Sequence, residues 1–180
     1  MKALLAFSIL IPMFGGFFFT KAKGSNPRPD GPASSYEYQY SGTMMYPLTY
    51  YDVKRDETGA VRIAYLEEDW DTRDRKGPDV IIIPGPKDFF GQVDAIVAKY
   101  RLHRLKGTYT PRADVRDGYM WHAYIRFQEN SISCGGSNAW PSQKLMDGIY
   151  SINGIIEAAI EASTEADIIA RQPYKEYRDY

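Results

Sequence analysis

Apolar and polar residues alternate along much of the chain, and a period of two is typical of β-strands. One such stretch covers 36–51, where the even-numbered positions are mostly Tyr, Met or Leu. A second covers 61–65 and follows the turn sequence DETG at 56–59, so we predict one long antiparallel hairpin. A short, wholly apolar strand is predicted at 79–83.

A spacing of three to four residues between apolar positions predicts two helices. The first covers 89–100 and follows Pro86, which suits an initial helical turn. The second begins at Pro141 and carries a stripe of Leu and Ile. A shorter helical piece is predicted at 164–171, before a Tyr-rich tail.

Residues 119–128 alternate again, and Glu129-Asn130 is the expected turn into a second hairpin with 131–135. In this register Ile125 faces Cys134, and directly paired residues point to the same side of a sheet. Cys134, the only cysteine, is therefore expected on the apolar face as a buried, unreactive thiol. The alternative is a nucleophile with His122 as its base, but this register places His122 on the opposite face.

Together these elements predict an α+β fold. We expect a two-layer domain in which an antiparallel sheet, made of two hairpins and a short strand, carries two main helices on one face. The packed domain is expected at 36–163, followed at 164–180 by the short helix and the Tyr-rich tail.

The N-terminus has the order of a secretory signal peptide: Lys2, an apolar run at 3–20, then small and basic residues. We expect a signal at 1–24, cleaved near Gly24, and hence an exported bacterial protein, periplasmic or at the cell surface. A retained anchor is the alternative, and only then would the protein contact a membrane. Residues 25–35, rich in Pro and Gly without periodicity, are expected to form a flexible tether.

Charge and cysteine content exclude several classes of site. The 180 residues include 22 Lys and Arg and 23 Asp and Glu, a formal charge of −1, which gives no electrostatic reason to expect nucleic-acid binding. Loss of residues 1–24 removes three lysines and no acid, which leaves a charge of −4. One cysteine excludes an internal disulfide and a zinc site built from cysteines.

The polar face of the second hairpin is the candidate ligand site. An arginine, a histidine and hydroxyl groups beside a loop that leads to a helix suit a small anion or a carboxylate. The alternative is a solvated sheet face, with glycines required by the turn and with Asn138 or Ser142 as the helix cap. The loop lacks the glycine signatures of nucleotide sites, so we expect no cofactor. The candidate residues are His122, Tyr124, Arg126, Ser133, Gly135, Gly136, Ser137 and Asn138.

An acidic segment at 67–74 could in principle hold Ca²⁺ or supply the paired carboxylates of a glycosidase. It does not fit an EF-hand, because Asp74 stands where glycine is required and Val80 where a bidentate glutamate is required. We therefore interpret the segment as a solvated loop and predict no metal site.

The Tyr-rich stretch at 36–51 has two interpretations. We expect its rings on a core face, since aromatic residues favour half-buried strands. Exposed instead, they would form a platform for a sugar or a protein partner, and the edge of the strand could accept a partner's strand.

The sequence GGSNAWP at 135–141, with the strand residues before it from 119 onward, resembles a hairpin-to-helix segment of uncharacterised bacterial proteins, several of them exported. The resemblance covers 119–141 alone and implies no activity. Cys134 stands where the pattern has a small residue such as Ser.

We expect a small exported binding or interaction domain without a catalytic residue, whose partner is a small anionic ligand, a glycan or a protein. The alternative is a small periplasmic hydrolase that uses His122 with a nearby acid or with Arg126. The hydrolase hypothesis requires His122 to lie within hydrogen-bond reach of a carboxylate in a concave pocket, and the binding hypothesis does not.

Overall fold

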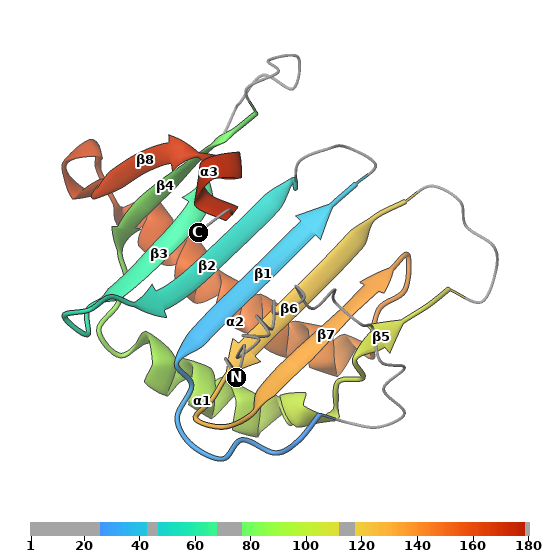
Figure 1. The fold of residues 1–180 in the computed structure, drawn as a ribbon. Helices are drawn as coiled ribbons and strands as arrows, with labels where there is room; N and C mark the ends of the chain where they lie inside the picture. The colour runs from blue at the N-terminus through green and yellow to red at the C-terminus, as the bar shows by residue number, and fades with distance from the viewer. Residues whose placement is uncertain (1–25, 43–46, 68–76, 112–117, 179–180) are drawn as a thin grey trace, which may run out of the picture.

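The computed structural model of the chain describes residues 26–42, 47–67, 77–111 and 118–178, and its strands form one sheet in the order β5-β7-β6-β1-β2-β3-β4-β8 (Figure 1). Neighbouring strands are antiparallel except β5 and β7, so the sheet is mixed. The strands are β1 Ser35–Ser41, β2 Thr49–Arg55, β3 Val61–Leu66, β4 Asp79–Pro84, β5 Thr108–Tyr109, β6 Met120–Arg126, β7 Ser131–Ser137 and β8 Ala170–Pro173.

Two long helices, α1 Phe89–Tyr100 and α2 Gln143–Ala162, lie together behind the sheet in Figure 1. Both match the helices expected from apolar spacing, and the predicted two-layer α+β class is confirmed. The described residues also include three short helical pieces: η1 Leu102–Arg104, η2 Glu165–Asp167 and α3 Tyr174–Arg178. None of the helices in the described ranges is long and apolar enough to cross a membrane.

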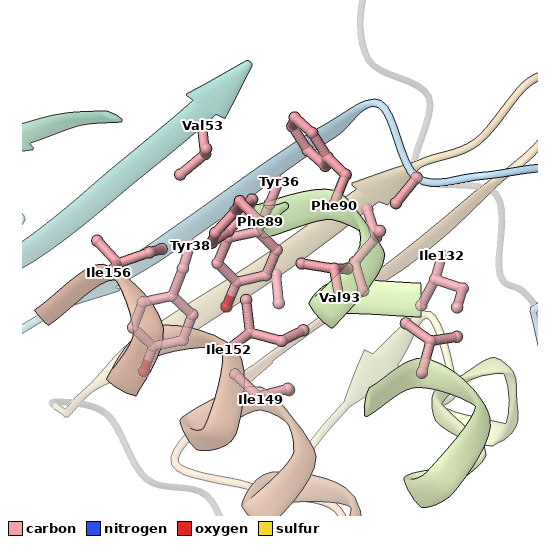
Figure 2. Close-up of a cluster of buried hydrophobic side chains, with 14 of the residues drawn as sticks. Tyr36, Tyr38, Val53, Phe89, Phe90, Val93, Ile132, Ile149, Ile152 and Ile156 are labelled. Atoms are coloured by element: carbon pink, nitrogen blue, oxygen red, sulfur yellow. The ribbon is translucent and has the colours of Figure 1, made fainter. Parts of the chain in front are cut away.

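The main core lies between the sheet and the two helices, because each of these layers has one apolar side to bury. Figure 2 shows its centre, where Tyr36 and Tyr38 of β1 meet α1 and α2. The helices contribute Phe89, Phe90, Val93, Ile149, Ile152 and Ile156. Tyr36 and Tyr38 are buried, which confirms the core interpretation for the β1 part of the Tyr-rich stretch.

That stretch is not the single strand that its alternation predicts. β1 ends at Ser41 and the chain reverses before β2 begins at Thr49, so β1 and β2 pair antiparallel. Even-numbered positions face the helices in β1, but odd-numbered positions face them in β2. Tyr38 is therefore in the main core, whereas Tyr50 is buried on the opposite face of the sheet. β1 lies between β6 and β2, and β2 lies between β1 and β3, so neither strand has an edge for a partner.

The C-terminal segment also differs from expectation. In place of one helical piece at 164–171, η2 is followed by β8, which pairs with β4 and extends the sheet. α3 then turns over the face opposite α1 and α2 (Figure 1). This face has apolar positions of its own on β2, β3 and β4, which explains why a Tyr-bearing segment covers it. The second cluster joins Tyr50, Ala64, Leu66 and Val80 with the partly buried Ile82, Tyr174 and Tyr177.

Residues 26–34 lack regular secondary structure, but they lie against the domain rather than projecting from it as the expected tether. Asn26 bonds to the carbonyl of Leu105 through its side chain at 2.8 Å, and the backbone N–H of Ala33 donates to Asp94 at 2.9 Å. The expected signal at 1–24 and most of the acidic segment, 68–76, lie outside the described residues.

Candidate functional site

The second hairpin forms as β6 and β7, with His122 opposite Gly135 and Tyr124 opposite Ser133. This register differs by two residues from the expected one, so that Cys134 pairs with Ala123 and not with Ile125. Side chains alternate with a period of two along a strand, so a shift of two leaves every residue on its expected face.

Cys134 is buried beside α1 and α2, as predicted, with 1 % of its surface exposed. Its Sγ lies 3.6 Å from the carbonyl oxygen of Ala123, and burial raises the pKa of the thiol to about 12. The thiolate, which is the nucleophilic form, is therefore scarce near neutral pH. The structure thus gives no support to a cysteine nucleophile.

The face opposite α1 and α2 brings together four of the predicted side chains, those of His122, Tyr124, Arg126 and Ser133. β1 lies beside β6 and adds Gln39 opposite His122 and Glu37 opposite Tyr124. Nε2 of His122 lies 3.4 Å from the hydroxyl oxygen of Ser133. We call this set the polar strip: Glu37, Gln39, His122, Tyr124, Arg126 and Ser133.

His122 is half-buried, and this burial lowers the pKa of its imidazole. The carboxylate of Glu37 opposes the shift, whereas the guanidinium of Arg178 adds to it. A pKa below the usual value of about 6.5 leaves the ring neutral at pH 7, with one nitrogen as donor and one as acceptor.

The loop residues of the prediction have structural roles in this fold. A side chain at Gly136 would point to the opposite face of the sheet from one at Gly135. Gly136 packs so closely that a Cβ there would lie 2.3 Å from the carbonyl oxygen of Ala139. That oxygen accepts a 2.8 Å hydrogen bond from the indole N–H of Trp121.

Asn138 adopts a positive φ of 48°, and its Oδ1 accepts the backbone N–H of Tyr119 at 3.0 Å. It therefore joins the start of β6 rather than capping a helix. Ser142 holds the N-cap position of α2, without a hydrogen bond from its side chain to the helix. Ser137 is exposed at the end of β7.

A serine next to a histidine invites comparison with a hydrolase, which also needs an orienting acid and an oxyanion site. Within the described ranges no carboxylate is hydrogen-bonded to His122, and Glu37 binds Arg178 at 2.9 Å. The backbone N–H of Gly135 is engaged by the carbonyl of Gly107 at 3.2 Å. The described residues also contain no group of three or more His, Cys, Asp or Glu that could hold a metal ion.

Sequence reasoning missed Glu37, Gln39 and Arg178. The first two are the polar positions of an alternating strand, so the same periodicity that identified the Tyr residues marks them. Arg178 could not be found this way, because it reaches Glu37 only after the C-terminal segment folds across the sheet, over a separation of 141 residues.

Compared with known protein families, the chain matches no family model, and it matches no curated protein either.

Proposed function

We propose that the protein is an exported binding domain without enzymatic activity, and that its ligand lies on the polar strip. One observation supports this most directly. The second face of the sheet is divided: α3 covers the β2–β4 half and reaches the polar strip through the ion pair of Arg178 with Glu37, whereas no helix or strand of the described ranges lies over β6 and β7 on this face (Figure 1). The strip thus presents polar groups on a rigid support.

The chemistry of the polar strip favours a hydroxylated ligand that carries a carboxylate, such as an acidic oligosaccharide. The neutral ring of His122, the amide of Gln39 and the hydroxyl of Ser133 can each donate to or accept from sugar hydroxyls. Tyr124 adds an amphipathic ring, and the exposed Arg126 can bind a carboxylate through two parallel hydrogen bonds. Positions 122 and 126 of one strand lie roughly 13 Å apart, a span that suits an extended ligand.

The test is a calorimetric titration of the protein with uronic-acid oligosaccharides and with neutral oligosaccharides of the same length. We expect Tyr124→Ala and His122→Ala each to weaken binding at least tenfold. Arg126→Ala is expected to remove the preference for the acidic ligands. Gln128→Ala changes an exposed residue just beyond β6 and is the matched control.

Two outcomes would contradict the proposal. If neither ligand class binds, or if the control weakens binding as much as the strip variants do, the polar strip is not the site. Cleavage of the oligosaccharide, detected by mass spectrometry and lost in His122→Ala, would instead support the hydrolase alternative.

Export is tested separately by mass spectrometry of the N-terminus after expression of the full chain in a bacterium. A mature N-terminus near residue 25 in the periplasmic fraction is expected. An intact Met1 in the cytoplasm would refute export.

A further inference from the structure

A second set of residues, separate from the polar strip, surrounds an open pocket at the C-terminal end of α1. The pocket has a volume of about 520 Å³, within the range of small-molecule sites. We call it the basic pocket, because four of its six lining residues carry a basic side chain. It is lined by Arg28, Pro29, Ala98, Arg101, His103 and Arg104.

Arg28 reaches the basic pocket because the segment that carries it is bonded to the domain. Its carbonyl oxygen accepts a 2.7 Å hydrogen bond from the side chain of Asn130, in the β6–β7 loop. Asn26, two residues earlier, bonds to the carbonyl of Leu105 and accepts the backbone N–H of Ser133 at 3.1 Å. The sequence position of Arg28, about 70 residues before α1 ends, gives no sign of this approach.

Arg101, His103 and Arg104 follow the end of α1, where cations are favoured by the helix dipole. The dipole accounts for these three but not for Arg28, which comes from another segment. Arg101 has a left-handed backbone, with φ 57°, at a position that glycine usually occupies. The fold thus holds an arginine where the backbone conformation alone would favour glycine.

Across the described ranges, none of these four basic side chains forms an ion pair. The acids on the same segments are engaged elsewhere: Asp30 accepts the backbone N–H of Glu129, and Asp94 accepts that of Ala33. Burial, then the charges of Arg28, Arg104 and Arg101, lower the pKa of His103. The three guanidinium groups therefore lie close enough to His103 to disfavour its protonation.

We propose that the basic pocket binds a phosphate-bearing small molecule, with the guanidinium groups of Arg28, Arg101 and Arg104 on its phosphate oxygens. Planar guanidinium groups match phosphate geometry through paired hydrogen bonds. A bound phosphate would also supply the negative charge that these basic side chains lack among the described residues. The volume exceeds what one phosphate fills, which leaves room for the organic part of a phosphate ester.

The two histidines of the chain allow a direct test, since His103 lines the basic pocket and His122 belongs to the polar strip. The protein is titrated with glycerol 3-phosphate and with pyrophosphate at constant ionic strength, and the imidazole signals are followed by NMR. We expect a saturable shift of the His103 signal and a higher pKa of His103, while the His122 signal stays in place.

Three variants separate binding from folding. Arg28→Ala and Arg101→Gly are each expected to weaken binding at least tenfold. Arg101→Gly is the sharper of the two, because glycine adopts the left-handed backbone without strain and the variant should remain folded. Lys144→Ala removes an exposed cation from α2, outside the pocket, and is expected to bind as the unchanged protein does.

Three results would overturn the proposal: no saturable shift of His103, an equal loss of binding in Lys144→Ala, or binding only to phosphatidylglycerol vesicles and not to glycerol 3-phosphate. The last result would point to a membrane surface in place of a soluble ester. The probes, the variants and the reporting histidine all differ from those of the polar strip, so either proposal can fail alone.

Discussion

The hydroxyl of Tyr36 donates a 2.6 Å hydrogen bond to Oδ1 of Asn153, and this bond joins the central strand β1 to α2 inside the core. Tyr36 is fully buried, and Asn153 is 5 % exposed. Burial raises the pKa of Tyr36 well above its ordinary value, so the phenol stays protonated and remains the donor. A buried polar group without a partner is costly, and here each of the two residues provides the partner of the other.

Substitution of Tyr36 by Phe should lower the free energy of unfolding by about 1–3 kcal/mol, because it leaves the buried Asn153 amide without that donor. The measurement is urea denaturation of Tyr36→Phe, Asn153→Leu and the double variant. We expect the double variant to lose less stability than the sum of the single losses, with a coupling of about 0.5–3 kcal/mol. Strict additivity would show that the bond contributes nothing.

Cys134 should resist alkylation in the folded protein. Its pKa of about 12 and its burial leave almost no accessible thiolate at pH 7. A chromogenic disulfide reagent is expected to react with less than a tenth of the protein in the time that completes the reaction in denaturant. Because the chain has one cysteine, the unfolded protein is its own control, and rapid stoichiometric labelling of the folded form would contradict the prediction.

Asp56 should contribute an acid-dependent part of the stability. A hydrogen bond from the Thr58 side chain is the largest cause that lowers the pKa of Asp56 to about 2, and Ala60, Arg62 and the Thr58 backbone add to it. The folded pKa lies below the unfolded value of about 3.9, so this contribution is nearly complete above about pH 5 and is lost progressively as pH falls toward 2.

Urea midpoints between pH 2 and pH 6 test this effect. Asp56→Asn is expected to have a lower midpoint at pH 6 and a smaller decline over the acid range than the unchanged protein. Glu57→Gln, in the same turn but exposed, is the control and should retain the full decline. Parallel declines in the unchanged protein and in Asp56→Asn would be evidence against the assignment.

Tyr177 should contribute to the stability of the C-terminal segment in two ways. Its hydroxyl donates to Asp52, and its ring packs edge-on against Tyr50 with 6.1 Å between centroids. We expect Tyr177→Phe to cost about 1 kcal/mol for the hydrogen bond, and Tyr177→Ala about 1–2 kcal/mol more for the uncovered apolar surface.

The control for these variants is Glu176→Ala, which changes an exposed neighbour on α3. Its free energy of unfolding should stay within about 0.5 kcal/mol of that of the unchanged protein. Urea unfolding measures all three. Equal stabilities of Tyr177→Ala and Glu176→Ala would mean that α3 does not help to hold the fold together.

The helices and the faces of the second hairpin could be predicted because each depends on local periodicity. α1 has the predicted limits, and Cys134 lies on the predicted face although the hairpin register differs by two residues. The same dependence on local periodicity made the prediction for 36–51 wrong. Even-numbered positions stay apolar on both sides of the point where the chain reverses, so the pattern predicts one face for Tyr38 and Tyr50. In the structure the two residues lie on opposite faces of the sheet.

The parts that sequence could not predict depend on contacts between distant segments. β8 pairs with β4 about 90 residues away, and Arg178 meets Glu37 across 141 residues. Arg28 lines the basic pocket on a segment that Asn26 and Asn130 bind to the domain. The composition of 25–35 predicts a loop, and residues 26–34 do lack regular secondary structure. Composition does not predict which part of the domain a loop lies against.

The two edges of the sheet are formed by short strands. β5 is two residues long and β8 four, and the side chain of Asn26 engages the N–H of Ser133 on β7. Long unpaired strand edges are the templates on which other chains add and fibrils grow. Because these edge strands are short, the sheet offers few unpaired backbone groups to which another chain could add a strand, and we expect the concentrated protein to have a low tendency to form amyloid.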